Sequence, residues 1–339
     1  MTVWSEFQPL TSVVLGNIFP SEEILTELNL KPRWQKPFKH IVDAALVELD
    51  IISATLLSLG VEVIRPSMYS MQQNGEFSVP PLAVRDVFMI YGDKCIEGNE
   101  AFKNNQPRIS SSRTAYSQLE IESIPTDNIW YNGSFNDLET KTIDRPYLHT
   151  ANILRCGNDI FVSKILGRTG NQLGLEHFKG WARAVNPTVR FHWVDTDEHL
   201  DGSIFLVRPG LMLSAIERHK LPEFFKNWTV IPVTRTATNK SIYQELYAHS
   251  YKKLNPIIAE KYSWFLQCEP EETLFSLNAL SINENTVVFP GFDAELFSAL
   301  EQHNVNCISV DMRATSFWDS GLHCCTNEIH RIGSLEDYS

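Results

Sequence analysis

Two adjacent cysteines, Cys324 and Cys325, follow His323 in the segment SGLHCCTNEIHR, in a chain of 339 residues with six cysteines in all. Zinc binding is disfavoured, because zinc needs three or four ligands at spacings such as CxxC or HxxxH, and the sequence has no second Cys/His cluster. A disulfide between neighbouring cysteines is strained and rare. Two interpretations stay open: a structural cysteine packed as a small hydrophobe, or a nucleophilic thiolate, which the polar, glycine-containing surroundings favour.

Other polar residues stand where β-rich runs begin, and we expect hairpin strands there. They are Asp86 in RD (85–86), His149 and Asn152 in HTANILRCGND (149–159), and His199 and Asp201 in EHLDG (198–202). His199 and Asp201 are two residues apart, so on a strand their side chains point to one face. A surface ion pair and ordinary turn residues are the alternative explanations. If these positions converge on the late cysteines, they form a Cys–His–acid site for nucleophilic catalysis.

The elements that must position these residues repeat along the chain. Each unit has two β-rich runs joined at a Gly, Asn or Asp, which favours a tight hairpin, followed by an amphipathic helix and another strand. The paired runs are residues 85–97, 151–163, 202–214 and 276–289, and the helix-and-strand halves are residues 42–66, 171–195, 216–233 and 293–312. FQPLTSVVLGN (7–17) is a candidate fifth pair with a less regular partner.

Such ββαβ units predict an α/β fold in which a ring of small sheets has helices on the outside. A plain parallel α/β sheet is the alternative, but it predicts single strands between helices, whereas here the strands come in pairs. Segments 66–84, 98–147 and 234–270 are polar, proline-bearing insertions. No linker divides the chain, so we expect one domain over residues 1–339.

Composition argues against several classes of protein. The net charge of −12, with no basic run longer than two residues, argues against nucleic-acid binding. No apolar run reaches the roughly 20 residues of a membrane helix, the N-terminus has no signal-peptide pattern, and six cysteines are too few for a disulfide scaffold. We therefore expect a cytoplasmic protein with free thiols and no membrane partner. Without a phosphate-binding glycine loop or a metal cluster, we also expect no cofactor.

Six motifs, in this order, resemble the amidinotransferases of the pentein superfamily, which include glycine and inosamine-phosphate amidinotransferases. The motifs are RDVFMIYGDKCIE, ANILRCGNDIF, EHLDG, RPGLMLS, SLNAL and GLHCCTNEIHRIGSLEDY. The resemblance runs from about residue 80 to the end, and the C-terminal block is its most specific part. It implies a five-bladed α/β propeller around a central site, a homodimer, and an enzyme that moves an amidino group from a guanidine donor to an amine.

The same resemblance implies roles for individual residues. It makes Cys324 the nucleophile and Cys325 a bystander, His199 the general acid/base, Asp86 the carboxylate near that histidine, Asp201 a substrate-holding carboxylate, and Arg218 the group that holds the donor's carboxylate. These assignments are predictions for the structure to examine.

The chain departs from the family at His149, where the resemblance implies an aspartate that clamps the guanidinium. An imidazole cannot replace a carboxylate that faces a cation, so we expect another acid to compensate, or the donor or the activity to differ. The predicted substitutes are Glu198, Glu271 and Glu272, and Ser276 is predicted to line the same site.

The chemistry that these residues support can be written as two steps. A thiolate attacks the guanidinium carbon while His199 protonates the leaving amine, and an acceptor amine then takes the amidino group from Cys324. L-arginine is the expected donor, in the biosynthesis of a specialised metabolite. If water replaces the amine, the same site is a guanidine or amidine hydrolase. If His149 silences the site, the protein only binds a cationic small molecule. The sequence leaves the acceptor amine and these alternatives open.

Overall fold

The computed structural model describes residues 2–28, 32–67, 72–73, 76–77, 80–98, 106–117, 119–123, 146–164, 169–196, 199–233, 277–318 and 320–339, and every structural statement below concerns these residues. Within them, five three-stranded sheets carry the fold. In each sheet two strands form an antiparallel pair, and the third strand runs parallel to the middle one. This is the strand order of the predicted ββαβ unit, so the alternative of one plain parallel sheet is wrong.

The strands of the five sheets come from successive stretches of the chain, except for one sheet that combines both ends. The sheets are β17 (Thr326–Arg331), β1 (Leu10–Leu15) and β2 (Glu62–Ile64); β5 (Phe88–Tyr91), β6 (Lys94–Glu97) and β7 (Ile121–Ser123); β8 (Ile153–Cys156), β9 (Asp159–Ser163) and β10 (Arg190–Val194); β11 (Ile204–Arg208), β12 (Leu211–Ser214) and β13 (Thr229–Pro232); and β14 (Leu280–Asn283), β15 (Thr286–Pro290) and β16 (Asn306–Val310). A separate two-stranded pair joins β3 (Gln72–Gln73) to β4 (Glu76–Phe77).

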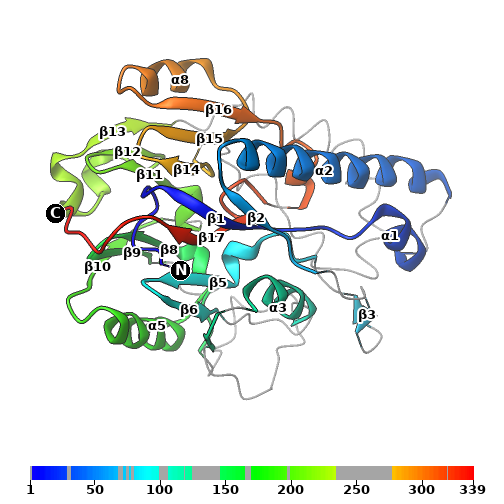
Figure 1. Ribbon diagram of the computed structural model, residues 1–339, viewed down its shortest axis with the longest axis horizontal. Helices are drawn as coiled ribbons and strands as arrows, with labels where there is room; N and C mark the ends of the chain where they lie inside the picture. The colour runs from blue at the N-terminus through cyan, green and yellow to red at the C-terminus, as the bar shows by residue number, and fades with distance from the viewer. Residues whose placement is uncertain are drawn as a thin grey trace.

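Helices connect the second and third strands of four sheets and lie on the outside of the molecule (Figure 1). They are α2 (Pro32–Ser58), which follows the short α1 (Ser21–Leu28), α3 (Gln106–Arg113), α5 (Gln172–Val185) and α8 (Ala294–Glu301). Two of them begin at a capping residue: the side chains of Asn171 and Asp293 accept hydrogen bonds from the backbone N–H groups three residues later, at 2.9 and 3.0 Å. The helices predicted within residues 42–66, 171–195 and 293–312 are therefore confirmed. The prediction that residues 98–147 form only an insertion is wrong, because α3 and β7 lie there and complete the sheet of β5 and β6.

The helix predicted within residues 216–233 is wrong. Two short 3-10 turns, η6 (Arg218–Lys220) and η7 (Glu223–Asn227), lead into β13 instead. Pro222 separates them, and a residue before proline is driven out of the helical region. Leu221 accordingly has φ −71° and ψ 151°. Only the strand half of that prediction is confirmed.

The strand predicted in residues 7–17 pairs with the other end of the chain. β17 runs antiparallel to β1, with Leu15 opposite Thr326. Just beyond β1, the Gly16 N–H donates to the Cys325 carbonyl at 2.7 Å. Only glycine fits there, because a Cβ would lie 1.9 Å from the Leu82 carbonyl oxygen. The ring therefore closes where Cys324 and Cys325 precede β17.

A short turn precedes the first strand of each sheet, and Asp86, Asp201 and Cys324 lie in these turns, with His149 and His199 just before two of them. The turns are η1 (Val84–Asp86) before β5, η4 (Thr150–Asn152) before β8, η5 (Leu200–Gly202) before β11, residues 277–279 before β14 and residues 322–325 before β17. η4 contacts both η1 and η5, the Arg85 N–H donates to the Cys324 carbonyl at 3.1 Å, and the His323 N–H donates to the Asn278 carbonyl at 3.1 Å. The heads of the repeated units therefore converge, as predicted.

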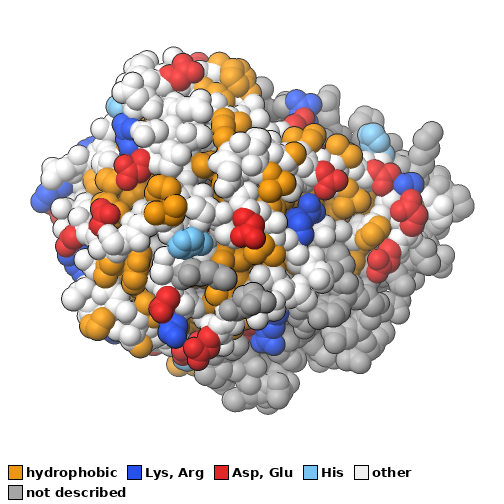
Figure 2. All heavy atoms as spheres, viewed as in Figure 1, with side chains coloured by type: hydrophobic (Ala, Val, Ile, Leu, Met, Phe, Trp, Pro, Cys, Tyr) orange, Lys and Arg blue, Asp and Glu red, His pale blue; other side chains and the backbone are white. Residues whose placement is uncertain are grey.

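Apolar side chains fill the spaces between the sheets and the helices. In one buried cluster, Leu175, Phe178 and Trp181 of α5 pack with Ile160 and Val162 of β9. On the face shown in Figure 2, lysines and arginines are interspersed with acidic and apolar side chains and do not gather into a basic tract. No helix in the described part of the chain is long and apolar enough to cross a membrane.

Candidate active site

Cys324 lies in the turn before β17, and two hydrogen bonds join it to the side chain of Asn278. The Asn278 Nδ2 donates to the Cys324 Sγ at 3.1 Å, and the Cys324 backbone N–H donates to the Asn278 Oδ1 at 3.0 Å. Cys324 is half-buried, whereas Cys325 is fully buried and its Sγ faces the Leu322 carbonyl at 3.3 Å. Of the two cysteines, Cys324 is therefore the one that a substrate can reach.

Asp201 lies against the same sulfur. Its Oδ2 is 3.4 Å from the Cys324 Sγ and accepts a hydrogen bond from the His323 Nδ1 at 2.8 Å. Its Oδ1 is buried and has no hydrogen-bond partner among the described residues. A buried carboxylate oxygen without a partner is costly. This oxygen, next to a thiol, suits a planar N–H donor such as a guanidinium group.

A second group of residues combines Asp86, His199 and His149. The His199 Nδ1 is 3.9 Å from the Asp86 Oδ1, and its Nε2 is 3.3 Å from the His149 Nδ1. In a hydrogen bond between two imidazole rings one nitrogen donates and the other accepts. The predicted pairing of Asp86 with His199 is thus present, but His149 contacts the His199 nitrogen that lies farther from Asp86.

The same three residues offer one ligand atom each, all within 4.8 Å of one another. Two imidazoles and a carboxylate can hold a divalent transition metal. A metal bound there would occupy His199 and prevent it from acting as an acid or base. The group Glu6, His323 and Glu328 also has metal-ligand spacing, but arginines already neutralise both of its glutamates.

The electrostatics of the site keep Cys324 protonated when no substrate is bound. Burial, and next the carboxylates of Asp201 and Asp86, raise the pKa of the Cys324 thiol well above its ordinary value, while the bond from Asn278 lowers it in part. Asp86 therefore acts on the sulfur, although it belongs to the second group. A cation bound between the two carboxylates would offset their charges and favour the thiolate.

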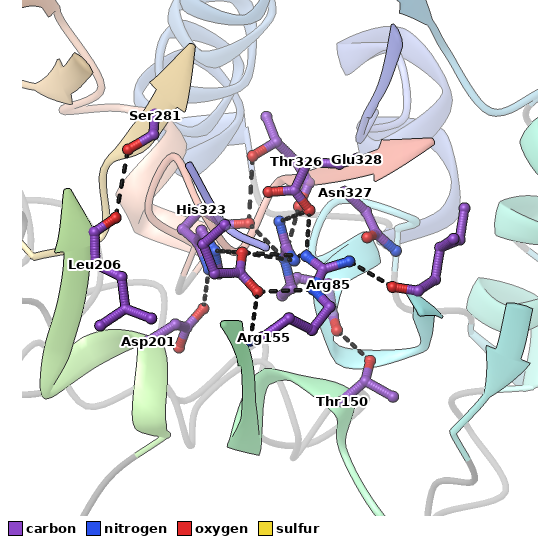
Figure 3. A network of polar contacts seen from close by, with 12 residues as sticks. Arg85, Thr150, Arg155, Asp201, Leu206, Ser281, His323, Thr326, Asn327 and Glu328 are labelled. Atoms are coloured by element: carbon purple, nitrogen blue, oxygen red, sulfur yellow. Dashed lines mark hydrogen bonds and ion pairs between the residues drawn. The ribbon is translucent and has the colours of Figure 1, made fainter. Parts of the chain in front are cut away.

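A fully buried ionic network lies next to these residues (Figure 3). Arg85 and Arg155 each lie 2.6 Å from Glu328 Oε2, and Arg155 also contacts Glu6 at 2.7 Å. His323 joins this network to the site, because its Nε2 is 3.5 Å from Glu6 and its Nδ1 bonds Asp201. The network therefore fixes the backbone turns that carry Asp86, Asp201 and Cys324.

Some predicted site residues are not brought to this centre. Arg218 is exposed, and its guanidinium donates to the carbonyls of Trp228 and Lys226 at 3.1 and 2.9 Å. Its role in holding the donor's carboxylate stays a prediction. Glu198, Glu271, Glu272 and Ser276 lie outside the described residues.

Three supporting residues were given no role from the sequence, although His323 was noted beside the cysteines. They are Asn278, His323 and Glu6. Asn278 lies in SLNAL, at the head of a repeated unit, and that position was the available signal. Nothing in the local sequence marks Glu6 as a partner of His323, because the two residues are far apart in the chain and meet only when β1 and β17 pair.

No family model matches the chain, but curated proteins and solved structures do. Glycine amidinotransferase, mitochondrial, of Xenopus laevis is 23% identical over 391 residues, covering 99% of this chain and 84% of that protein. Inosamine-phosphate amidinotransferase 1 of Streptomyces glaucescens is 23% identical over 318 residues, covering 86% of this chain and 81% of that protein.

Among solved structures, an amidinotransferase of the saxitoxin biosynthetic pathway from Microseira wollei has a TM-score of 0.74 at 19% identity, covering 100% of this chain and 99% of that one. The similarity confirms the resemblance found in the motifs and the pentein fold that it implies. The relatives also agree with the predicted class of enzyme.

Proposed function

We propose that this chain, a homologue of the pentein amidinotransferases, moves an amidino group from a guanidine donor to an amine through a covalent intermediate on Cys324. The observation that carries this proposal is the contact between the Cys324 Sγ and Asp201, whose other oxygen is free to accept from a guanidinium. Asp86 and His199 supply the acid–base pair beside it.

In the first step, Asp201 and Asp86 hold the guanidinium, and their charges are offset by the donor's cation. The sulfur of Cys324 forms a bond to the guanidinium carbon, and the bond from that carbon to the substituted nitrogen breaks. The thiol proton leaves with the departing amine, through His199. The product is a cationic amidino-thioether on Cys324 and a free amine.

In the second step, an acceptor amine attacks the same carbon. Its proton passes through His199 to the sulfur, so the thiol is regenerated and the amidino group leaves on the acceptor. The two half-reactions give ping-pong kinetics. If water attacks instead, the intermediate releases urea, which is the hydrolase alternative.

L-arginine is the proposed donor, in the biosynthesis of a specialised metabolite. The two buried carboxylates, Asp86 and Asp201, support the binding of a cationic donor. His149 lowers the negative charge that a guanidinium would meet, so we propose that Glu198, Glu271 or Glu272 supplies the missing carboxylate. Arg218 is the proposed partner of the donor's own carboxylate.

Intact-protein mass spectrometry after incubation with L-arginine and no acceptor tests this proposal. We expect a mass gain of one amidino group on the wild-type protein and none on Cys324→Ala. Cys307→Ala, which removes another half-buried free thiol, is the matched control and should keep the adduct. Release of urea or citrulline without an adduct would favour the hydrolase. No adduct and no product with several guanidines would contradict the proposal.

A further inference from the structure

His323, directly before Cys324, has both ring nitrogens against carboxylates. Its Nδ1 is 2.8 Å from the Asp201 Oδ2, and its Nε2 is 3.5 Å from the Glu6 Oε2. All three side chains are at most 3% exposed. Among the described histidines, no other has this arrangement on both nitrogens.

The charge of the ring follows from the state of its two partners. Burial raises the pKa of Glu6, but Arg155, the bond from His323 and Arg85 together outweigh burial and lower this pKa to about 2. Burial likewise raises the pKa of Asp201, but the bond and charge of His323, with the charges of His199 and Arg85, bring this pKa below its ordinary value. Ionised carboxylates only accept hydrogen bonds, so both nitrogens of His323 must carry a proton.

Other charges around the ring oppose or support this state. Burial and Arg85 lower the pKa of His323, but the bonds to Asp201 and Glu6, together with the charge of Asp201, outweigh them and raise it above its ordinary value. Glu328 also interacts with His323 and lies within the same network. The thiol of Cys324 adds no charge while it is protonated. The balance therefore favours a buried imidazolium.

We propose that His323 is a positioning residue: a permanently protonated imidazolium that holds Asp201 ionised and turned so that its free Oδ1 faces the donor cation. His323 does not touch the donor itself. It acts through Asp201, so its loss affects the binding of the donor more than that of the acceptor amine. This part of the inference rests on the proposed function.

The variants His323→Asn and His323→Gln test the two contacts separately. The Asn amide can replace the Nδ1 donor to Asp201, whereas the Gln amide reaches the Nε2 position and keeps only the contact to Glu6. With L-arginine as the donor, we expect His323→Gln to lower kcat/KM for the donor about 10- to 100-fold, the loss typical of one charged hydrogen bond. His323→Asn should lose clearly less, and KM for the acceptor should change little in both.

Nitrogen NMR of histidine side chains gives a readout that needs no substrate. In the wild-type protein we expect one ring with both nitrogens protonated at pH 8, and this signal should be absent in His323→Gln. Thermal unfolding shows whether each variant is folded. If neither folds, the wild-type spectrum still decides the charge, because among the histidines that the structure describes only His323 has carboxylates on both nitrogens.

The inference would be overturned if the His323 ring titrated near the ordinary histidine pKa of about 6.5. A donor kcat/KM that is equal in wild type, His323→Asn and His323→Gln would also overturn it. If the wild-type protein reacts with no guanidine at all, the proposed function fails. The NMR result then still decides whether His323 is an imidazolium.

Discussion

Cys324 is surrounded by groups that suppress its own ionisation. The sulfur is bonded by Asn278, touches Asp201 and feels the charge of Asp86. A resting thiol is protected from oxidation and from adventitious alkylation, since the thiolate is the reactive form. In the proposed mechanism, the same carboxylates that suppress the thiolate attract the guanidinium cation. The mechanism therefore couples binding of the donor to activation of Cys324.

The variant Asp86→Asn tests this electrostatic reading. Burial and Asp201 raise the pKa of Cys324 together with Asp86, so removing the charge of Asp86 lowers that pKa and leaves more thiolate at pH 8. We expect faster alkylation of Cys324 by iodoacetamide, followed by peptide mass spectrometry. Asp93→Asn, on the exposed tip of the following hairpin, should react like wild type. An alkylation rate for Asp86→Asn that is unchanged or slower would contradict the prediction.

At the scale of elements, each sheet presents one turn to the site, and close backbone packing holds those turns together. Gly16 shows how tight this packing is, because β1 ends there against both the Leu82 carbonyl and the turn that carries Cys324 and Cys325. A methyl group cannot be added without moving backbone. The site therefore depends on the junction of β1 with β17 as much as on its own side chains.

A pair of glycine substitutions tests this dependence. Gly16→Ala puts a Cβ 1.9 Å from the Leu82 oxygen and should destabilise the protein by about 1–3 kcal/mol, the usual cost of overpacking. Gly180→Ala, on the exposed face of α5 with no atom within 4 Å of the new Cβ, should stabilise it by about 0.5–1 kcal/mol. Urea unfolding measures both.

The urea unfolding curves of the two glycine variants can also contradict this prediction. If both glycine variants shift the midpoint in the same direction, close approach at Gly16 is not what holds the turn. The rate of amidination of Cys324 should also fall in Gly16→Ala and stay unchanged in Gly180→Ala.

Across the whole molecule, a buried ionic network takes the place that apolar side chains fill elsewhere. Glu6 comes from the N-terminal segment, Arg85 from η1, Arg155 from β8, and Glu328 and Arg331 from β17. Breaking a buried pair by removing one partner costs about 3–5 kcal/mol, because a charge is left without compensation. The network thus fixes which sheets meet at the centre of the ring.

Acid should destabilise the protein through this network. Burial opposes ionisation of Glu6 and Glu328, but the arginines and His323 together outweigh it, and the folded-state pKa is about 2 for Glu6 and lower than normal for Glu328. Their contribution is complete above the unfolded value of about 4.3 and is lost as the pH falls through the folded-state values. We expect the urea midpoint to fall steeply below about pH 4.5.

The variant Glu328→Gln tests the origin of that acid sensitivity. It should lose about 3–5 kcal/mol at pH 7 and show a shallower decline toward acid than wild type. Glu295→Gln, on the exposed first turn of α8, serves as the control and should follow the wild-type curve. A parallel decline in all three proteins would assign the acid sensitivity to other groups.

By itself the sequence determined the repeated ββαβ unit, because hairpin glycines and apolar periodicity are local properties of the chain. It also placed Asp86, His199, Asp201 and Cys324 at or just beside the heads of those units, and the structure brings these heads together. The helix predicted from apolar spacing within residues 216–233 does not form, because Pro222 interrupts that segment.

Only the tertiary structure decided which distant residues meet. The pairing of β1 with β17, the contact of His149 with His199, and the two carboxylates on His323 join residues from 50 to 321 positions apart. Local patterns carry no information about such distances. They follow from closure of the ring, which brings both ends of the chain into one sheet and buries their charged side chains beside Cys324.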